Sequence, residues 1–312
     1  MTLAPVFLFP GQGSQHVGMG KSLYDGYPAV RRLFEEASDA VKMDFAQLCF
    51  QGPEASLVQT DNAQPAITLV NLACLQVLRE EGVAPSAAAG HSLGEYSALC
   101  AAGVLSFPET MRLVQIRGSA MKLAAERHPG GMTAVFGLDR GTLAAICAEA
   151  GDAGSVEVAN HNSPTQVALT GAKEALLQAA ALAKKRGAKL SAPLKVSGPW
   201  HSRYMAEAAE LMRAALAECA MASPSFPVLS NVTARPYSDD PGRIREGLVA
   251  QMVTPVLWND SMELLVRDGH RLFVEVGPGK VLAGLMRDIS RDAKVFGALI
   301  PGDLPNLRAA LS

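Results

Sequence analysis

The chain has 312 residues and a mass of 32.8 kDa, a length that allows two domains of average size or one large α/β domain. Hydrophobic residues make up 49% of the sequence and charged residues 19%, a composition that excludes intrinsic disorder. The 28 Lys and Arg residues nearly balance the 30 Asp and Glu residues, which gives a net charge of -2. Because no run of five like charges occurs, the charge pattern excludes binding to nucleic acid or to an anionic membrane surface.

The cysteines give no sign of a disulfide framework or a zinc site, because they are odd in number, scattered, and without a C-x-x-C pair. The first ten residues lack the basic segment of a secretory signal, and the longest nearly apolar stretch, residues 66–78, is too short to cross a bilayer. We therefore expect a cytoplasmic protein without a metal site. The five cysteines are Cys49, Cys74, Cys100, Cys147 and Cys219.

The first part of the chain alternates strand and helix patterns. An apolar run at 5–9 predicts a buried strand that leads into a glycine-bearing turn at 11–15. A segment of small residues at 86–90 predicts a second short strand, followed by a sharp turn and a helix. Apolar residues at helical spacing predict helices over 24–50, 64–81, 94–102 and 107–125.

A cluster of helix breakers at 127–131 separates a second unit from the first. The patterns after it follow the order β-α-β-β-α-β, which is typical of a ferredoxin-like fold. We therefore predict a small ferredoxin-like subdomain at 127–197, inserted into a core made of residues 1–126 and 198–312. Its expected strands are 132–138, 156–160, 166–170 and 189–196, and its expected helices are 141–149 and 173–186.

The chain then returns to α/β patterning. Helices are expected over 204–220 and 244–252 and directly after Pro278 and Gly279, and strands over 227–230, 271–276 and 295–299. The fold class predicted from these patterns is α/β.

Residues 90–94, Gly-His-Ser-Leu-Gly, match the nucleophile elbow G-x-S-x-G. In this motif, glycines flank a strained turn between a strand and a helix, and the serine hydroxyl is exposed at the end of the sheet. The expected strand before Gly90 and the expected helix after Gly94 supply that context. The sequence therefore favours Ser92 as a nucleophile over a plain surface turn, with the backbone N-H of Leu93 placed to stabilise an oxyanion.

A serine nucleophile needs a base, and His201 is the best candidate. It follows a strand end and a Gly-Pro turn, a loop position of the kind that often holds catalytic groups. A capping or surface role for His201 remains open at this point. We interpret His91, next to Ser92, as structural, and His16, His128 and His270 as loop residues.

Arg117 lies on the apolar face of the helix expected at 107–125, four residues after Leu113 and four before Met121. Burying an unpaired guanidinium is costly, so its partner should be an internal acid or an anionic substrate. The planar fork of an arginine suits a carboxylate.

Seven segments together resemble the malonyl-CoA:acyl-carrier-protein transacylases, and the likeness spans nearly the whole chain. They are Phe-Pro-Gly-Gln-Gly-Ser-Gln at 9–15, Gly-His-Ser-Leu-Gly-Glu-Tyr-Ser-Ala-Leu at 90–99, Gln-Ile-Arg-Gly at 115–118, Asn-His-Asn-Ser-Pro-Thr-Gln-Val at 160–167, Trp-His-Ser at 200–202, Ser-Asn-Val-Thr-Ala at 230–234 and Val-Glu-Val-Gly-Pro-Gly at 274–279. The resemblance implies an α/β-hydrolase-like core that carries a ferredoxin-like insert.

The resemblance also implies a reaction. Ser92 would be acylated by malonyl-CoA with His201 as its base, Arg117 would hold the malonyl carboxylate, and the malonyl group would pass to the phosphopantetheine thiol of an acyl carrier protein, in fatty-acid or polyketide synthesis. Malonyl-CoA and the carrier are thus the expected partners. No cofactor is implied, and nothing in the sequence demands more than a monomer.

Further residues take their roles from the same resemblance. Backbone N-H groups of Gln12 and Leu93 would form the oxyanion hole, and a backbone carbonyl near Gln251 would orient the histidine, with Gln251 placed in the substrate site. Asn160 and Asn162 would contact the pantetheine arm. Malonyl-specific members often carry Phe before the histidine, whereas this chain has Trp200, whose bulk should disfavour a methyl branch on the substrate.

Three alternatives stay open. An acyl hydrolase that clears carrier proteins would gain nothing from a buried arginine, so Arg117 argues against it. A malonyltransferase subunit of a malonate decarboxylase would act on a different carrier. A non-catalytic carrier-binding module would not need Ser92, His201 and Arg117 together. A dinucleotide site at Gly11 and Gly13 is excluded, because His16 stands where the third glycine of G-x-G-x-x-G is required.

Overall fold

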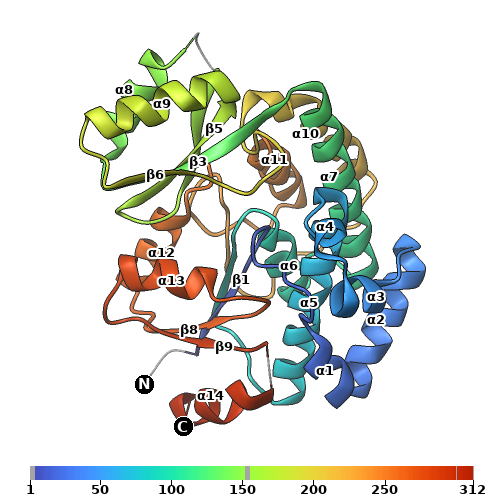
Figure 1. Cartoon of the computed structure of the whole chain (residues 1–312). Helices are drawn as coiled ribbons and strands as arrows, with labels where there is room; N and C mark the ends of the chain where they lie inside the picture. Colours follow the sequence, from blue (N-terminus) through green and yellow to red (C-terminus); the bar gives the residue numbers. More distant parts are fainter. Residues whose placement is uncertain (1–3, 152–154, 300, 312) are drawn as a thin grey trace.

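Two separate sheets organise the chain in a computed structural model that describes residues 4–151, 155–299 and 301–311. A parallel sheet lies at the centre of the larger part of the molecule, and a smaller antiparallel sheet lies above it in the view of Figure 1. The α/β class expected from the sequence is confirmed. No helix within the described ranges is long and apolar enough to cross a membrane.

The larger sheet has five parallel strands in the order β7-β2-β1-β8-β9. Its middle strand is fully buried, which explains the continuous apolar sequence Val-Phe-Leu-Phe. The carboxyl ends of β1 and β2 lie side by side, since Phe9 pairs with Gly90. The strands are β1 (Val6–Phe9), β2 (Ala87–Gly90), β7 (Val228–Leu229), β8 (Leu272–Glu275) and β9 (Lys294–Gly297).

Helices surround this sheet on both faces (Figure 1). The long helices α5 and α7 cross closely at Gly118, where an added Cβ would lie 2.9 Å from the carbonyl oxygen of Thr60. The helices of the larger part are α1 (Lys21–Gly26), α2 (Pro28–Val41), α3 (Phe45–Gln51), α4 (Glu54–Leu57), α5 (Thr60–Glu80), α6 (Gly94–Ala101), α7 (Phe107–Arg127), α10 (Ala206–Ala217), α11 (Pro241–Gln251), α12 (Trp258–Arg267), α13 (Val281–Ile289) and α14 (Leu304–Leu311), with 3-10 turns η1 (Arg203–Met205) and η2 (Pro301–Asp303).

The single helix expected over 24–50 is wrong, because the structure has three helices there. Tyr27 is extended and precedes Pro28, which begins α2. Lys42, with a φ of 55°, ends that helix in the left-handed region. The side chain of Asp44 then caps α3 by accepting the Gln47 N-H at 2.8 Å. Local backbone chemistry therefore overrides the continuous apolar spacing.

The smaller sheet is antiparallel, with the order β4-β5-β3-β6. Helices α8 and α9 cover one face and share a core with the strands that includes Leu143, Leu169 and Leu176. The other face contributes Met132 and Ala168 to the main core of the molecule. The elements are β3 (Gly130–Phe136), α8 (Arg140–Glu149), β4 (Val156–His161), β5 (Gln166–Ala172), α9 (Lys173–Lys185) and β6 (Leu190–Pro193), in the order expected from the sequence.

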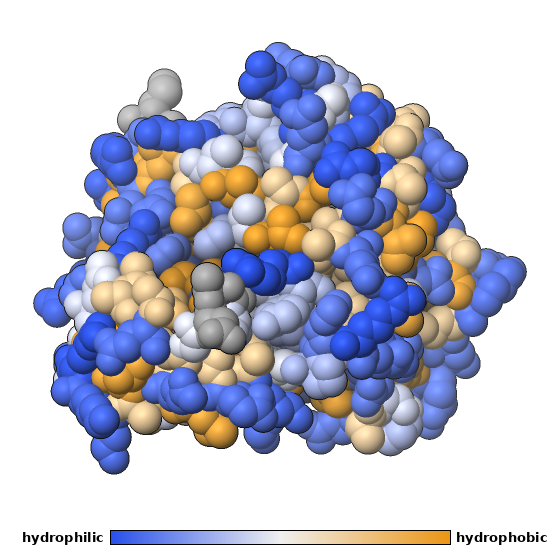
Figure 2. Space-filling view, turned by 90° about the horizontal axis from the view of Figure 1, so that it is seen from above, coloured by the Kyte–Doolittle hydropathy of each residue, from blue (hydrophilic) through white to orange (hydrophobic). Residues whose placement is uncertain are grey.

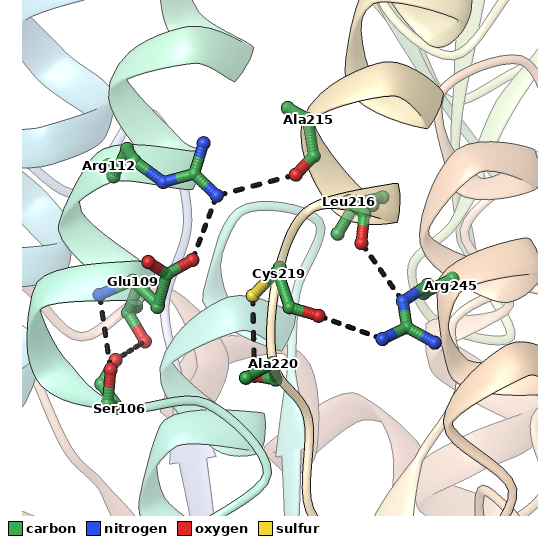
Figure 3. A network of polar contacts seen from close by, with 9 residues as sticks. Ser106, Glu109, Arg112, Ala215, Leu216, Cys219, Ala220 and Arg245 are labelled. Carbon is green, nitrogen blue, oxygen red and sulfur yellow. Dashed lines mark hydrogen bonds and ion pairs between the residues drawn. The ribbon is translucent and has the colours of Figure 1, made fainter.

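Two arginines join α10 to its neighbours α7 and α11 (Figure 3). From α11, Arg245 donates to the carbonyl oxygens of Leu216 and Cys219 at 2.9 and 2.8 Å. From α7, Arg112 donates to the Ala215 carbonyl oxygen at 3.4 Å. These positive charges lie at the C-terminal end of α10, where the helix dipole favours them. They join α10 to α7, which carries Arg117, and to α11, which ends at Gln251.

Candidate active site

Ser92 lies at the turn between β2 and α6, as the elbow pattern predicts. Its φ of 51° places it in the left-handed region, which a non-glycine residue rarely adopts. An added Cβ on Gly90 would lie 1.9 Å from the backbone carbon of Gly94, and one on Gly94 would lie 2.0 Å from the carbonyl oxygen of Phe9. The two glycines are therefore required for the chain to turn this tightly against β1.

His201 lies next to this serine, although 109 residues separate them in sequence. Its Nε2 is 2.8 Å from Ser92 Oγ, and its Nδ1 is 2.8 Å from the backbone oxygen of Gln251. Since a carbonyl oxygen only accepts, Nδ1 carries the hydrogen and Nε2 is free to accept the serine proton. Burial and the nearby Arg117 lower the pKa of His201 to about 3. The imidazole is therefore neutral, the state that a base requires.

Arg117 is 1% exposed, as its place on the apolar face of α7 predicts. It donates to Gln64 Oε1 and Gln251 Oε1, each at 2.9 Å, and to Ser92 Oγ at 3.1 Å. No carboxylate forms an ion pair with it among the described residues. Its Nε is buried without a hydrogen-bond partner. The site thus contains a buried positive charge held by neutral amides, which is costly unless an anion binds there.

Two backbone N-H groups face the same region. Those of Gln12 and Leu93 donate no hydrogen bond to any residue within the described ranges. The loop after β1 approaches the elbow so closely that a Cβ on Gly11 would lie 2.4 Å from the His91 oxygen and 3.6 Å from the Leu93 nitrogen. The close approach brings the loop that carries Gln12 to the N-terminus of α6.

A cavity of about 260 Å³ opens onto these groups. Ser92, His201, Arg117, Gln12 and Leu93 all line it. Its remaining wall is mostly apolar and comes from both parts of the molecule; it includes Met121, Met132, Asn160, Asn162, Leu194, Val196, Trp200, Val281 and Leu285. On the face seen from above, hydrophobic side chains gather near the middle and hydrophilic ones surround them (Figure 2).

Gln251 does not lie on the cavity wall. It is 1% exposed, its backbone oxygen contacts His201, and its side chain contacts Arg117 and the Ser92 carbonyl oxygen, the last at 2.9 Å. The sequence expectation about the histidine-orienting carbonyl matches this geometry. The expectation that Gln251 touches substrate does not follow from it.

Sequence reasoning missed several buried polar residues that support the site. Gln64 accepts from Arg117, and Asn231 accepts the Ser92 N-H at 2.7 Å. Glu95 contacts both Asn231 and Gln251. A signal existed for Glu95, because it stands three residues after Ser92 in a helix that otherwise has no charged residue. Gln64 and Asn231 carry no comparable signal, since amides in helices and turns are common.

The other histidines stay outside the reacting pair. The Nε2 of His91 is 2.8 Å from Asn162 Oδ1, and its ring packs against Trp258, in agreement with a structural role. His16, His128 and His270 do not line the cavity. Across the described parts of the chain, no group of three or more potential ligands could hold a metal ion.

Comparison with known proteins places this geometry in a family. The sequence profile of the Acyl transferase domain matches residues 6–311. The malonyl CoA-acyl carrier protein transacylase of Bacillus subtilis is 41% identical over 95% of this chain and 93% of its own length. That of Salmonella typhimurium is 43% identical over 91% of this chain and 92% of its own length.

Solved structures agree with the sequence relatives. The malonyl CoA-acyl carrier protein transacylase of Coxiella burnetii superposes with a TM-score of 0.96 at 35% identity, over 98% of this chain and 97% of that one. A malonyl-transacylase in complex with a type II PKS acyl-carrier protein superposes with a TM-score of 0.94 at 38% identity, over 97% and 98% of the two chains. The chain belongs to the acyl transferase domain family and is a member of its malonyl CoA-acyl carrier protein transacylase group.

Proposed function

We propose that this protein transfers a malonyl group from malonyl-CoA to the phosphopantetheine thiol of an acyl carrier protein, through an acyl-enzyme on Ser92. The names of its relatives support the reaction. The observation that carries the proposal is the buried guanidinium of Arg117, 3.1 Å from the Ser92 hydroxyl and without a carboxylate partner among the described residues. A substrate with a free carboxylate next to its thioester carbonyl satisfies both groups at once.

In the first half of the reaction, Ser92 Oγ attacks the thioester carbonyl while His201 Nε2 accepts the hydroxyl proton. The tetrahedral oxyanion accepts hydrogen bonds from the backbone N-H groups of Gln12 and Leu93, each donor stabilising the transition state by roughly 3 to 4 kcal/mol. The C-S bond then breaks, CoA leaves as a thiol with the proton from His201, and a malonyl ester remains on Ser92.

The second half reverses these roles. The neutral imidazole of His201 takes the proton of the phosphopantetheine thiol as the sulfur attacks the malonyl ester. The same oxyanion site stabilises the second tetrahedral intermediate. The C-O bond to Ser92 breaks, and the serine oxygen recovers its proton from His201, which leaves the enzyme unchanged.

Arg117 holds the malonyl carboxylate in this proposal. Gln251 positions Arg117 through its side chain and His201 through its backbone oxygen. Trp200 lines the cavity beside His201, and its bulk supports malonyl over methylmalonyl as substrate. Asn160 and Asn162 line the cavity, which supports a contact of these side chains with the pantetheine arm.

The finer architecture is part of the same proposal. The β-α-β-β-α-β order and the strand order β4-β5-β3-β6 support a ferredoxin-like subdomain at 127–197. The serine turn after a parallel strand supports an α/β-hydrolase-like core made of 1–126 and 198–312. One chain supplies every group of the described site, which supports a monomer.

The direct test is the mass of a phosphopantetheinylated acyl carrier protein after incubation with malonyl-CoA and catalytic amounts of this protein. We expect the carrier to gain one malonyl group with the wild type and none with Ser92→Ala. Release of free malonate without gain on the carrier would support the hydrolase instead. No reaction by either route, with Ser92 also inert to a fluorophosphonate, would favour a non-catalytic carrier-binding module.

A further inference from the structure

Glu95 is a fully buried carboxyl that lies beneath the reacting groups and does not line the cavity. It stands in the first turn of α6, three residues after Ser92 in sequence. No Lys, Arg or His forms an ion pair with it among the described residues. Because burying a carboxyl without a cationic partner is costly, its hydrogen bonds must compensate for the lost hydration.

Every hydrogen bond that the Glu95 carboxyl makes with the described residues is one that it accepts. Its Oε1 accepts from the Tyr237 hydroxyl at 2.7 Å and from the Asn231 backbone N-H at 3.0 Å. Its Oε2 accepts from the side-chain amide nitrogen of Gln251. Because a carboxylate only accepts and a protonated acid must also donate, this set of partners suits the ionised form.

Two of these partners lead directly to the reacting groups. Gln251 contacts His201 through its backbone oxygen, and Arg117 and the Ser92 carbonyl through its side chain. Asn231 holds the elbow from below, since its Oδ1 accepts the Ser92 N-H and its Nδ2 donates to the Gly90 oxygen, each at 2.7 Å.

The Glu95 carboxylate helps to orient the Gln251 amide, together with Arg117 and the Ser92 carbonyl oxygen. A carboxylate attracts the NH2 end, which turns the oxygen end toward the guanidinium of Arg117. If Glu95 lost its charge, its side chain could present a donor to that NH2 group, and two donors would then face each other. Loss of that charge would therefore weaken the hold on the Gln251 amide, which would keep only its contacts with Arg117 and the Ser92 carbonyl oxygen.

We propose that Glu95 is a positioning residue for acyl transfer, whose carboxylate sets Gln251 and Asn231 and through them the imidazole of His201, the guanidinium of Arg117 and the elbow at Ser92. The reaction that Glu95 would support is the proposed function, whereas its contacts with Tyr237, Asn231 and Gln251 are independent of that function.

Protonation of Glu95 should make the reaction depend on pH. Burial raises the pKa of Glu95 to about 7, although its three donors act in the opposite direction. The titratable groups that face it are Tyr237, Arg117 on α7, and Tyr96 on its own helix. The pKa of His201, at about 3, lies far below. We therefore expect activity to fall on acidification near pH 7 as Glu95 is protonated, far above the pKa of His201.

The test is the pH profile of two rates in the full-length protein: malonyl transfer to the carrier, and labelling of Ser92 by a fluorophosphonate. In the second reaction Ser92 Oγ bonds to phosphorus, fluoride leaves, and the proton goes to His201. We expect both wild-type rates to fall below a midpoint near pH 7. In Glu95→Gln both should be at least about 10-fold lower at pH 8, with no midpoint between pH 5 and 8.

Two further variants guard against a merely structural effect. Tyr237→Phe removes one donor from the carboxylate and should move the midpoint upward by about one pH unit. Glu275→Gln changes a second buried carboxyl, whose hydrogen bonds go to the backbone N-H groups of Leu282 and Ala283, and should leave the midpoint in place.

A midpoint near 7 that persists in Glu95→Gln, or wild-type rates in that variant, would overturn the positioning role. The labelling arm needs no malonyl group, so it decides the role of Glu95 even if the wild type fails to transfer malonate. Failure of the proposed function would instead appear in the wild type, as labelling of Ser92 without malonylation of the carrier.

Discussion

The Arg117 guanidinium donates a hydrogen bond of 3.1 Å to the Ser92 hydroxyl, which also lies 2.8 Å from His201 Nε2. One oxygen thus contacts both the base that would take its proton and the cation that would bind the substrate. In the proposed reaction, an entering carboxylate would compete with Ser92 for the guanidinium and free the hydroxyl for attack. Arg117 would thereby link substrate binding to activation of the nucleophile.

Replacing this arginine should change acyl-donor preference. Arg117→Ala removes the only charge that we assign to the malonyl carboxylate, so kcat/KM for malonyl-CoA should fall about 10²-fold or more. Transfer of acetyl, which has no carboxylate, should be retained or gained. Steady-state transfer to the carrier with each thioester measures this ratio.

Lys122→Ala provides the matched control on the same helix, because Lys122 forms only a partly exposed ion pair with Asp61. The malonyl-to-acetyl ratio should stay at the wild-type value in that variant. An equal loss of both activities in Arg117→Ala would contradict the carboxylate-binding role.

His201 and Glu95, two buried titratable groups of the site, should affect stability in opposite directions. The pKa of His201 is lowered from 6.5 to about 3, so below pH 6.5 the unfolded chain binds a proton that the folded chain does not, and acid destabilises the fold. The pKa of Glu95 is raised from 4.5 to about 7, so between these values the folded chain binds the extra proton, and acid stabilises the fold.

Removing either group should expose the effect of the other. Between pH 6.5 and 4.5 the free energy of unfolding of Glu95→Gln should fall more steeply with acid than that of the wild type, and that of His201→Ala less steeply. Urea unfolding at a series of pH values measures both slopes. Parallel curves for all three proteins would refute the pKa shifts.

Arg245 of α11, which binds carbonyl oxygens at the end of α10, should matter for stability and not for chemistry. Arg245→Met removes two hydrogen bonds from a charged donor, to the carbonyl oxygens of Leu216 and Cys219 at 2.9 and 2.8 Å, and should cost about 1 to 3 kcal/mol in the free energy of unfolding. Arg243→Ala on the same helix changes an exposed residue with only a loose 3.9 Å ion pair to Asp240, and should cost near zero. Chemical denaturation compares them; equal effects would show that the α10 contacts contribute nothing.

The elbow should not accept a larger residue at its second glycine. Gly94→Ala places a Cβ 2.0 Å from the Phe9 carbonyl oxygen, backbone that cannot move without disturbing β1, so the variant should lose about 3 kcal/mol or more. Gly26→Ala, at the end of α1 with no atom within 4 Å of the added Cβ, should be neutral or slightly stabilised. Thermal unfolding distinguishes the two, and a Gly94→Ala protein as stable as Gly26→Ala would show that the close approach is not required.

Much of this arrangement was accessible from the sequence, because it depends on short-range patterns. Ser92 could be recognised from its flanking glycines, Arg117 from its place on an apolar helix face, and the smaller sheet from its β-α-β-β-α-β order. The helix α14 and the break after Tyr27 were missed, since tertiary packing and single-residue backbone preferences decide them.

What sequence reasoning could not supply is the layer beneath the reacting groups. Gln64 lies 53 residues from Arg117 in the sequence, and Asn231 lies 139 residues from Ser92. Glu95 is close to Ser92 in the sequence, but its partner Asn231 lies 136 residues away. The amides of Gln64 and Asn231 carry no specific signal, and the place of Glu95 on α6 marks it as unusual without naming its partners, because a buried amide or acid is informative only once its neighbours are known.

The most direct test of the acyl-enzyme is the intact mass of the protein after brief incubation with malonyl-CoA, followed by peptide mapping. The structure predicts a gain of one malonyl group on Ser92, absent in Ser92→Ala, less abundant with methylmalonyl-CoA or acetyl-CoA, and discharged only when the carrier protein is added. An adduct on another residue, or one that disappears in water without the carrier, would contradict it.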